Sequence, residues 1–300
     1  MATVQKNGAG QDAFAQANKK IIEFLTNGKV PWDVPFTEQG IPRNMATRNA
    51  YRGINLLLLA PLGYERNYFI TQNQLAEIKG SIMAKERPHV VTFWNHPKDD
   101  KGKVPAQENA KSGATILGCY YVYNAQQCSW PDDAITPEVM QETHTIVAAD
   151  AILRGMAHCP QVHEMASTAY YDIVEDVICM PKQKGQKKAD GYYSTLLRQL
   201  VHSTGHHTRL DRMGLAQMRE YGYTGISLED LVADIGTWHL RSIAGISETC
   251  GFDTMYIRVC LEKFLRDPRL IYTAATLAQQ AVDFILNVQH DVEETPAVIE

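Results

Sequence analysis

The stretch Tyr192–Leu210, which reads YYSTLLRQLVHSTGHHTRL, decides how the C-terminal half of this chain folds. Its apolar residues recur at helical spacing and are Leu196, Leu197, Leu200 and Val201. This spacing predicts a helix that is held in a core by one face. His202 and His206 are four residues apart, so on a continuous helix they share a face about one turn apart. Two imidazoles in that arrangement can bind one metal ion together.

The composition indicates a soluble globular protein. Three hundred residues are enough for two domains and a sizeable core, and 45% hydrophobic with 21% charged residues is ordinary for this class. The net charge of −5 excludes a protein that is basic all over, but a local basic groove for nucleic acid is compatible with it. The six cysteines are scattered, which favours reduced thiols and a cytoplasmic location. Because the run Leu56–Pro61 is far shorter than the ~20 residues that span a bilayer, we expect no membrane association.

Composition and periodicity divide the chain into two parts. Residues 1–10 are predicted to be a mobile leader, residues 11–130 a small module of helices and strands, and residues 131–140, which are acidic and hold two prolines, a linker. Residues 141–290 are predicted to be mainly helical, and residues 291–300 a frayed acidic tail. The expected fold class is therefore α+β, with a small α+β module ahead of a mainly helical domain.

Periodicity also predicts individual elements. The expected helices are 11–27, 72–78, 141–156, 228–240 and 274–288. The expected strands are Tyr68–Ile70, His89–Trp94, Ala114–Asn124 and Tyr170–Pro181. Two further segments are expected to be irregular: the charged loop 95–113 and the short polar connection 161–170.

Polar and basic side chains gather in Ile41–Leu59, just before an apolar run. The candidates for nucleic-acid contact there are Arg43, Asn44, Arg48, Tyr51, Arg52 and Asn55. Arginine forks fit phosphates, whereas planar Tyr, Asn and Arg side chains suit the faces and edges of unpaired bases. Lys85 adds a basic turn, and Tyr123 lies on a tyrosine-rich strand of which one face could stack on bases. An ordinary solvated loop over a buried helix is the alternative explanation.

The helix predicted after Ser227 could complete a metal site. It carries three acids: Glu229, Asp230 and Asp234. One of them, with His202 and His206, would give two histidines and a carboxylate, which suits Zn²⁺ or another divalent metal. The first two acids are also explained by favourable charge in the first helical turn, whereas Asp234 lies among apolar residues and needs another reason. Histidines that bind no metal are the alternative.

These motifs resemble those of ArdC-type antirestriction proteins. Leu197–Leu210 is similar to the family run H-E-L-x-H-x-T-G-H-x-x-R-L, and Pro42–Leu59 is similar to the signature P-x-N-x-x-T-x-x-x-Y-R-G-I-N-x-L-x-L. Tyr123 and Asn124, with Gln127, resemble the aromatic-Asn-x-x-Gln that closes the family's N-terminal domain, which adds Asn124 to the candidates for DNA contact. The resemblance implies an N-terminal domain that binds single-stranded DNA and a C-terminal zincin-like metallopeptidase domain.

The resemblance breaks where the family's chemistry resides. Arg198 and Gln199 stand where the family has its first histidine and its catalytic glutamate. An arginine cannot ligate zinc and a glutamine cannot act as a general base, so the pair weighs against efficient proteolysis. Glu229 is then the candidate for both the third metal ligand and the base, with Asp234 as the alternate third ligand.

Two functions remain open at this point. In the first, the protein binds single-stranded DNA and protects incoming plasmid DNA from restriction in the recipient cell, as in conjugation, while the metal domain is structural or vestigial. In the second, the protein is a metal-dependent protease that its DNA-binding module targets to a host protein, such as a restriction protein. The pair Arg198 and Gln199 favours the first hypothesis.

Overall fold

The structure is a computed structural model that describes residues 11–35, 40–95, 116–131, 147–182, 190–212 and 226–288. The predicted leader 1–10, the predicted tail 291–300, and most of the predicted linker 131–140 and charged loop 95–113 lie outside these ranges. The described ranges hold the whole histidine stretch and all of the candidate DNA contacts.

The N-terminal part is built around a four-stranded sheet of order β1-β2-β5-β4, in which β1 and β2 are parallel and the other pairs antiparallel. Its strands are β1 (Arg43–Asn44), β2 (Tyr68–Ile70), β4 (His89–Asn95) and β5 (Ile116–Asn124). A small second sheet pairs β3 (Ser81–Ile82) with β6 (Cys128–Ser129). The helices of this part are α1 (Gln11–Thr26), α2 (Ile54–Leu59), α3 (Gln72–Glu77) and the 3₁₀ turns η1 (Ala60–Leu62) and η2 (Ala125–Gln127).

The C-terminal part is mainly helical. Its helices are α4 (Val147–Gly155), α5 (Asp190–Ser203), α7 (Leu228–Ala244), α8 (Thr254–Arg266) and α9 (Leu270–Leu286). A three-stranded sheet of order β7-β9-β8 is formed by β7 (Gln161–Ala166), β8 (Tyr170–Asp172) and β9 (Val177–Pro181). The overall class is α+β, as predicted.

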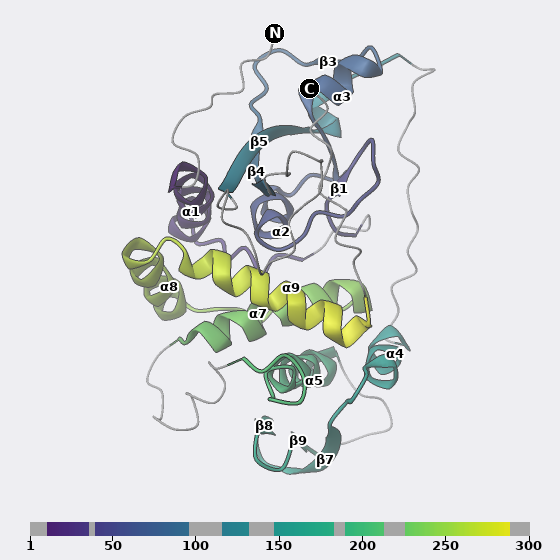
Figure 1. The fold of residues 1–300 in the computed structure, drawn as a ribbon, viewed down its shortest axis with the longest axis vertical. Helices are drawn as coiled ribbons and strands as arrows, with labels where there is room; N and C mark the ends of the chain where they lie inside the picture. The colour runs from purple at the N-terminus through teal and green to yellow at the C-terminus, as the bar shows by residue number, and fades with distance from the viewer. Residues whose placement is uncertain are drawn as a thin grey trace, which may run out of the picture.

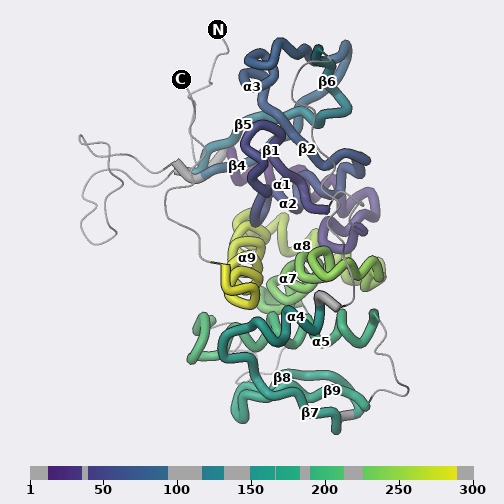
Figure 2. The backbone as a smooth tube through the Cα atoms, turned by 90° about the vertical axis from the view of Figure 1, so that its right-hand side faces the viewer, coloured from purple at the N-terminus to yellow at the C-terminus, as the bar shows by residue number. Residues whose placement is uncertain are grey.

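The elements form layers along the long axis of the molecule. Figure 1 shows the N-terminal sheet with α2 above, helices α7, α8 and α9 across the middle, and α5 with the three-stranded sheet below. The tube in Figure 2 shows the same sequence of layers from the side. The C-terminal helices α7, α8 and α9 thus lie between the N-terminal sheet and the histidine-bearing helix α5.

One hydrophobic core runs through both parts of the chain. It contains Trp32 and Leu57 from the N-terminal part together with Phe264 and Ala275 from the C-terminal helices. Polar bonds cross the same junction: Trp32 Nε1 donates to the hydroxyl of Tyr256 at 3.0 Å. Because apolar burial is shared across the junction, we infer that the two parts stabilise each other's fold.

Most predicted elements are confirmed, and the differences have local causes. Residues 161–166 form strand β7, where the sequence predicts an irregular connection. The side chains of this edge strand are mostly exposed, so it lacks the apolar alternation by which a strand is recognised. The predicted strand Tyr170–Pro181 is two strands, which reverse at a turn where Asp176 has a φ of 52°. Helix α9 begins at Leu270, four residues earlier than predicted.

The apolar run of helix α2 is buried at the junction. Gly53, which precedes the helix, has a φ of 55°, a conformation that glycine adopts readily, and its N–H donates to Gln279 Oε1 of α9 at 3.0 Å. The helix itself spans six residues, five of them buried. In the described part of the chain, no helix combines the length and apolarity that crossing a membrane requires.

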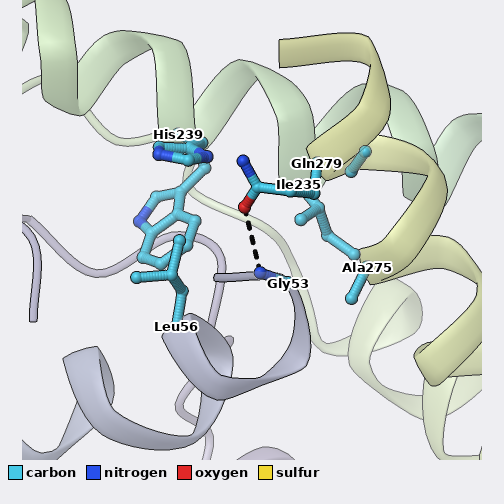
Figure 3. A pocket seen from close by; sticks show the side chains of 8 residues that line it. Gly53, Leu56, Ile235, His239, Ala275 and Gln279 are labelled. Atoms are coloured by element: carbon cyan, nitrogen blue, oxygen red, sulfur yellow. Dashed lines mark hydrogen bonds between the residues drawn. The ribbon is translucent and has the colours of Figure 1, made fainter. Parts of the chain in front are cut away.

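A small cavity of about 10 Å³ lies where α2 meets α7 and α9, lined by Gly53, Leu56, His239 and Gln279 among others (Figure 3). It has room for about one water molecule and none for an organic ligand. His239 is fully buried beside it, and this burial lowers the pKa of the imidazole to about 4; the Asp283 charge acts in the opposite direction, and the Arg52 charge in the same one. The histidine is therefore neutral in the folded protein near neutral pH.

The lowered pKa of His239 predicts that the free energy of unfolding depends on pH. Below its unfolded pKa of about 6.5 the unfolded chain binds a proton that the folded chain refuses until about pH 4, so stability falls as the pH drops through that window. We expect His239 to account for a loss of about 2 kcal/mol in the free energy of unfolding between pH 7.5 and pH 5. Urea unfolding at both pH values should show this loss reduced in His239→Gln and unchanged in the exposed control His158→Asn. Equal pH dependence in all three proteins would contradict it.

Candidate functional site

Helices α5 and α7 bring His202 beside Glu229 and Arg198 beside Asp234, and the two helices pack very closely. The α5 side chains that were predicted to face the core are buried: Leu196, Leu197, Leu200 and Val201. A Cβ atom on Gly236 of α7 would lie 2.9 Å from Val201 Cγ1, closer than carbon atoms approach, so glycine is what permits this contact. The polar side chains along the edge of this interface are consequently held in fixed positions.

Glu229, in the first turn of α7, is buried and paired with an arginine. Its side chain is 2% exposed, and Arg212 donates to both of its oxygens, from Nε at 2.9 Å and from Nη2 at 2.6 Å. His202 of α5 also reaches it, with Nδ1 3.3 Å from Oε1. A bidentate pair between arginine and carboxylate is among the strongest polar contacts in proteins, and it uses both oxygens of Glu229.

These partners keep Glu229 ionised. Burial alone would raise the pKa of the carboxyl group, but the hydrogen bonds from His202 and Arg212 and the positive charge of Arg212 outweigh it and lower the pKa below the usual value of a glutamate. A carboxylate that is held in this way is a weak proton acceptor. The predicted role of Glu229 as a general base therefore fits poorly with its surroundings.

Asp234, the alternate third ligand, is also paired with an arginine. Its side chain is 4% exposed, and its Oδ1 accepts a hydrogen bond from Arg198 Nη1. Its Oδ2 accepts from the hydroxyl of Tyr256 at 2.7 Å. Arg198 Nη2 also lies 3.5 Å from Asp230 Oδ1, while Asp230 caps the helix through Ser227. The question of why an acid lies among the apolar residues of α7 thus has an answer: its partners come from α5 and α8.

His206 does not share a helical face with His202, because α5 ends at Ser203. The chain turns there, and His206 follows the helix, with its Nδ1 2.8 Å from the hydroxyl of Thr208. Burial lowers the pKa of His206, with smaller opposing and reinforcing contributions from nearby charges, the largest of them Asp176. The two imidazoles are therefore not placed one turn apart on one helix, which the spacing assumed, and the assignment of both as metal ligands stays a prediction.

The residues at this place fit a divalent metal poorly. Within the described residues there is no group of three His, Cys, Asp or Glu side chains that could hold an ion. The oxygens of Glu229 and Asp234 are used by Arg212, Arg198 and Tyr256, and His206 lies beyond the helix. Gln199 is buried and cannot serve as a base. We therefore derive no reaction step through a metal.

Arg52, a candidate for DNA contact, bridges the two parts of the protein. Its guanidinium forms an ion pair with Asp283 of α9, and its side chain is 40% exposed. Asp283 also accepts from Gln279, whose Oε1 binds the N–H of Gly53. These contacts place Arg52 in the junction between α2 and α9, so its replacement would remove an ion pair of this junction as well as any contact with DNA.

Asn55 and Tyr51 also have structural roles. Asn55 bonds both backbone groups of Thr92 in β4: its Nδ2 donates to the carbonyl, and its Oδ1 accepts from the N–H, both at 2.8 Å. Tyr51 is buried and packs edge-to-face against Phe69 with ring centroids 6.1 Å apart. Both side chains hold α2 and its approach onto the sheet, which the composition of the stretch could not show.

Three more candidates are held in turns or packed. Asn44 accepts from the N–H groups of Ala46 and Thr47, both at 2.9 Å. Asn124 is fully buried and forms a capping box with Gln127. Tyr123 packs against the small second core of the N-terminal part. The motif Tyr-Asn-x-x-Gln thus closes the end of strand β5, and Asn124 is inaccessible to a ligand in this conformation.

Arg48, Lys85 and Tyr121 are better placed to meet a ligand. The Arg48 guanidinium lies 5.4 Å from the centre of the Tyr68 ring, and Lys85 is exposed in the turn that leads to β4. Tyr121 is 52% exposed, on the strand position that pairs with Val90 of β4. Arg43 is half-buried and donates to the carbonyl of Arg48 at 3.4 Å. Basic and aromatic side chains are therefore available on the N-terminal sheet and its turns.

Two residues that shape the interface between α5 and α7 have no motif in the sequence that points to this role. Arg212 and Tyr256 are 17 and 22 residues from Glu229 and Asp234, the acids they bind, and no periodic pattern links such positions. The only signal was the charge itself, since a buried acid requires a partner. Tyr121 could have been recognised from the strand alternation, which places it on the face opposite Tyr120.

Comparison with protein families gives two matches in order along the chain. Residues 11–123 match the family model described as the N-terminal domain of anti-restriction factor ArdC. Residues 148–277 match the model described as a zincin-like metallopeptidase. The two matches follow the same order as the two parts of the structure.

Individual relatives are similar to this chain over most of its length. Crystal structures of the antirestriction protein ArdC from plasmid R388 resemble this one: the metal-free form with a TM-score of 0.68 and 26% identity over 93% of this chain and 100% of that one, and the Mn(II)-bound form with 0.70 and 27% over 91% and 97%. A DNA primase TraC of Escherichia coli is 27% identical over 90% of this chain, which spans only 27% of that protein's length. The uncharacterized protein y4eC of Sinorhizobium fredii is 26% identical over 94% of both chains.

Asn55 allows a test that separates folding from DNA contact. Removing its side chain leaves the N–H and carbonyl of Thr92 without these partners, at a cost of about 1–3 kcal/mol for each buried group left unpaired. We expect Asn55→Ala to lower the free energy of unfolding by about 2–4 kcal/mol, and the exposed neighbour control Asn49→Ala to change it by less than about 0.5 kcal/mol. Urea denaturation measures both. Unchanged stability with weakened DNA binding in Asn55→Ala would return this residue to the ligand contacts.

Proposed function

Because the chain belongs to the ArdC-type antirestriction proteins, with an ArdC N-terminal domain followed by a zincin-like domain, we propose that it binds single-stranded DNA and protects incoming DNA from restriction in the recipient cell. The observation that carries this proposal is the likeness in fold to the R388 antirestriction protein, which extends over 93% of the chain and so includes both parts and their junction.

The N-terminal sheet supplies suitable chemistry for a single strand. The exposed ring of Tyr121 can stack on a base of any sequence, because every base has a π face. Lys85 and Arg87 are exposed in the turn before β4, the strand that pairs with β5 and Tyr121, where they can meet phosphates. We place the DNA contacts on this combination and on Arg48, and assign Tyr51, Asn55 and Asn124 to the scaffold.

The protective function does not require cleavage of a protein. A peptidase of the zincin type needs a metal-bound water and a base beside it. The family and the Mn(II)-bound relative imply a divalent cation, Zn²⁺ or Mn²⁺, but the donor set of this chain fits it poorly, and Gln199 and the paired Glu229 offer no base. Binding therefore explains the arrangement better than the alternative of a metal-dependent protease, and the C-terminal domain would act as a scaffold.

The first test is the salt dependence of DNA binding. Each phosphate contact on a single strand contributes about 0.7 to the slope of log K against log salt concentration. We expect the double variant Arg48→Gln and Lys85→Gln to lower the slope by about 1.4, whereas Arg258→Gln, an exposed control on α8, leaves it unchanged. Fluorescence anisotropy with a labelled oligothymidylate measures the slope. An equal decrease of the slope in the double variant and in Arg258→Gln would argue against this site, as would tighter binding to duplex than to single-stranded DNA.

The second test measures protection in cells. Unmodified plasmid DNA is transferred into restricting and non-restricting recipients that express the protein, and the ratio of the two transfer efficiencies reports protection. We expect the protein to raise this ratio, His202→Ala to retain the effect because it leaves the DNA contacts intact, and the double variant Arg48→Gln and Lys85→Gln to lose it. Loss of protection in a folded His202→Ala protein that still binds DNA would favour the protease alternative instead.

A further inference from the structure

Three carboxylates of α7 are paired with arginine side chains that lie outside this helix. Asp234 and Asp230 meet Arg198 of α5, and Glu229, which directly precedes Asp230 in α7, meets Arg212. The two helices run in opposite directions here, since His202, one turn after Arg198, reaches Glu229, which precedes Asp234 in α7. Each of these three acids is thus paired with a guanidinium group.

We propose that the guanidinium of Arg198 takes the place of a metal cation in this domain, so that a permanent ion pair with Asp234 and Asp230 holds α5 to α7. Burying Asp234 requires a counter-charge, because an isolated carboxylate in an apolar interior is costly. A bound cation or a fixed guanidinium can each supply it. In this chain the guanidinium is present, with one nitrogen bonded to Asp234 and the other 3.5 Å from Asp230.

A bound cation and the guanidinium of Arg198 cannot both occupy the carboxylate oxygens of Asp234. Oδ1 of Asp234 accepts from Arg198 and Oδ2 accepts from Tyr256, whose own pKa is raised, chiefly by burial, so that its hydroxyl remains a donor. Both oxygens are therefore already used. A divalent ion would have to displace Arg198 and would then lie beside a second positive charge in a partly buried place, since the Arg198 side chain is only 32% exposed.

The replacement changes how the domain responds to its surroundings. An arginine remains charged throughout the physiological pH range and cannot be removed by a chelator. A metal-held domain gains stability from the ion and loses it when the ion is removed. The ion pair therefore predicts a domain with the zincin-like fold whose stability is independent of metal supply. This inference concerns the C-terminal domain alone and does not rest on the proposed binding of DNA.

The test begins with the wild-type protein and needs no variant. Protein is dialysed against limiting Zn²⁺ or Mn²⁺, and its metal content and thermal midpoint are measured with and without EDTA. We expect far less than one equivalent of either metal and no change of the midpoint with EDTA. A content near one equivalent, removed by EDTA together with a fall in the midpoint, would overturn the proposal.

A reciprocal variant tests the position of the charge. R198H puts a second imidazole one helical turn before His202 and frees Oδ1 of Asp234, which together offer two histidines and a carboxylate. We expect R198H to take up close to one Zn²⁺ and its thermal midpoint to rise by several degrees with the metal. R198K keeps the positive charge at this position and should take up none, and R258H, an exposed control on α8, should behave as the wild type.

Each result for metal uptake by R198H, R198K and R258H supports or overturns the proposal. Uptake by R198H with none by R198K and R258H supports the proposal, since only loss of the positive charge at position 198 opens the place to an ion. A folded R198H protein that takes up no metal overturns the claim that Arg198 stands in the cation's position. Uptake by R198K overturns the claim that charge excludes the ion. If R198H does not fold, the wild-type measurement and R198K still decide the proposal.

Discussion

The close packing of α5 against α7 is the constraint on which the C-terminal part of this structure depends. Gly236 lets the helices approach until Val201 fills the space that a side chain would occupy, and Glu229 and Asp234 of α7 are buried at this interface. Buried carboxylates must be paired, so Arg198 and Arg212 are required at the same interface. The close packing and the pairing of the buried acids are thus features of one interface.

The same layer of helices also supports the N-terminal sheet. Helix α9 receives Arg52 and Gly53 through Asp283 and Gln279, and Tyr256 of α8 binds both Trp32 and Asp234. Tyr256 therefore connects the junction of the two parts with the interface of α5 and α7. A change at Arg198, which pairs with Asp234, can therefore affect the N-terminal part through the contacts of Tyr256. Such a connection supports the proposed role of the C-terminal domain as a scaffold.

The candidate DNA contacts illustrate the limits of composition as a guide. A cluster of Arg, Asn and Tyr in Ile41–Leu59 fits nucleic acid in its chemistry, but Asn55, Tyr51 and Arg52 are used to hold α2 between the sheet and α9. These residue types suit both purposes because a buried backbone group and a base edge ask for the same donors and acceptors. Exposure, which distinguishes Tyr121 and Lys85 from buried residues such as Tyr51 and Asn124, is a property of the folded chain.

The sequence by itself determined the class of the fold, most helices and strands, and the family, since each depends on local periodicity or on short motifs such as the run that ends at Leu210. It also marked Arg198 and Gln199 as residues that cannot perform zincin chemistry. The structure showed that α5 stops at Ser203, before His206, at a turn held by local backbone hydrogen bonds. The tertiary structure alone decided that Arg198 and Arg212 pair with the acids of α7. Those pairings depend on contacts between residues far apart in the chain, and such contacts have no period in the sequence.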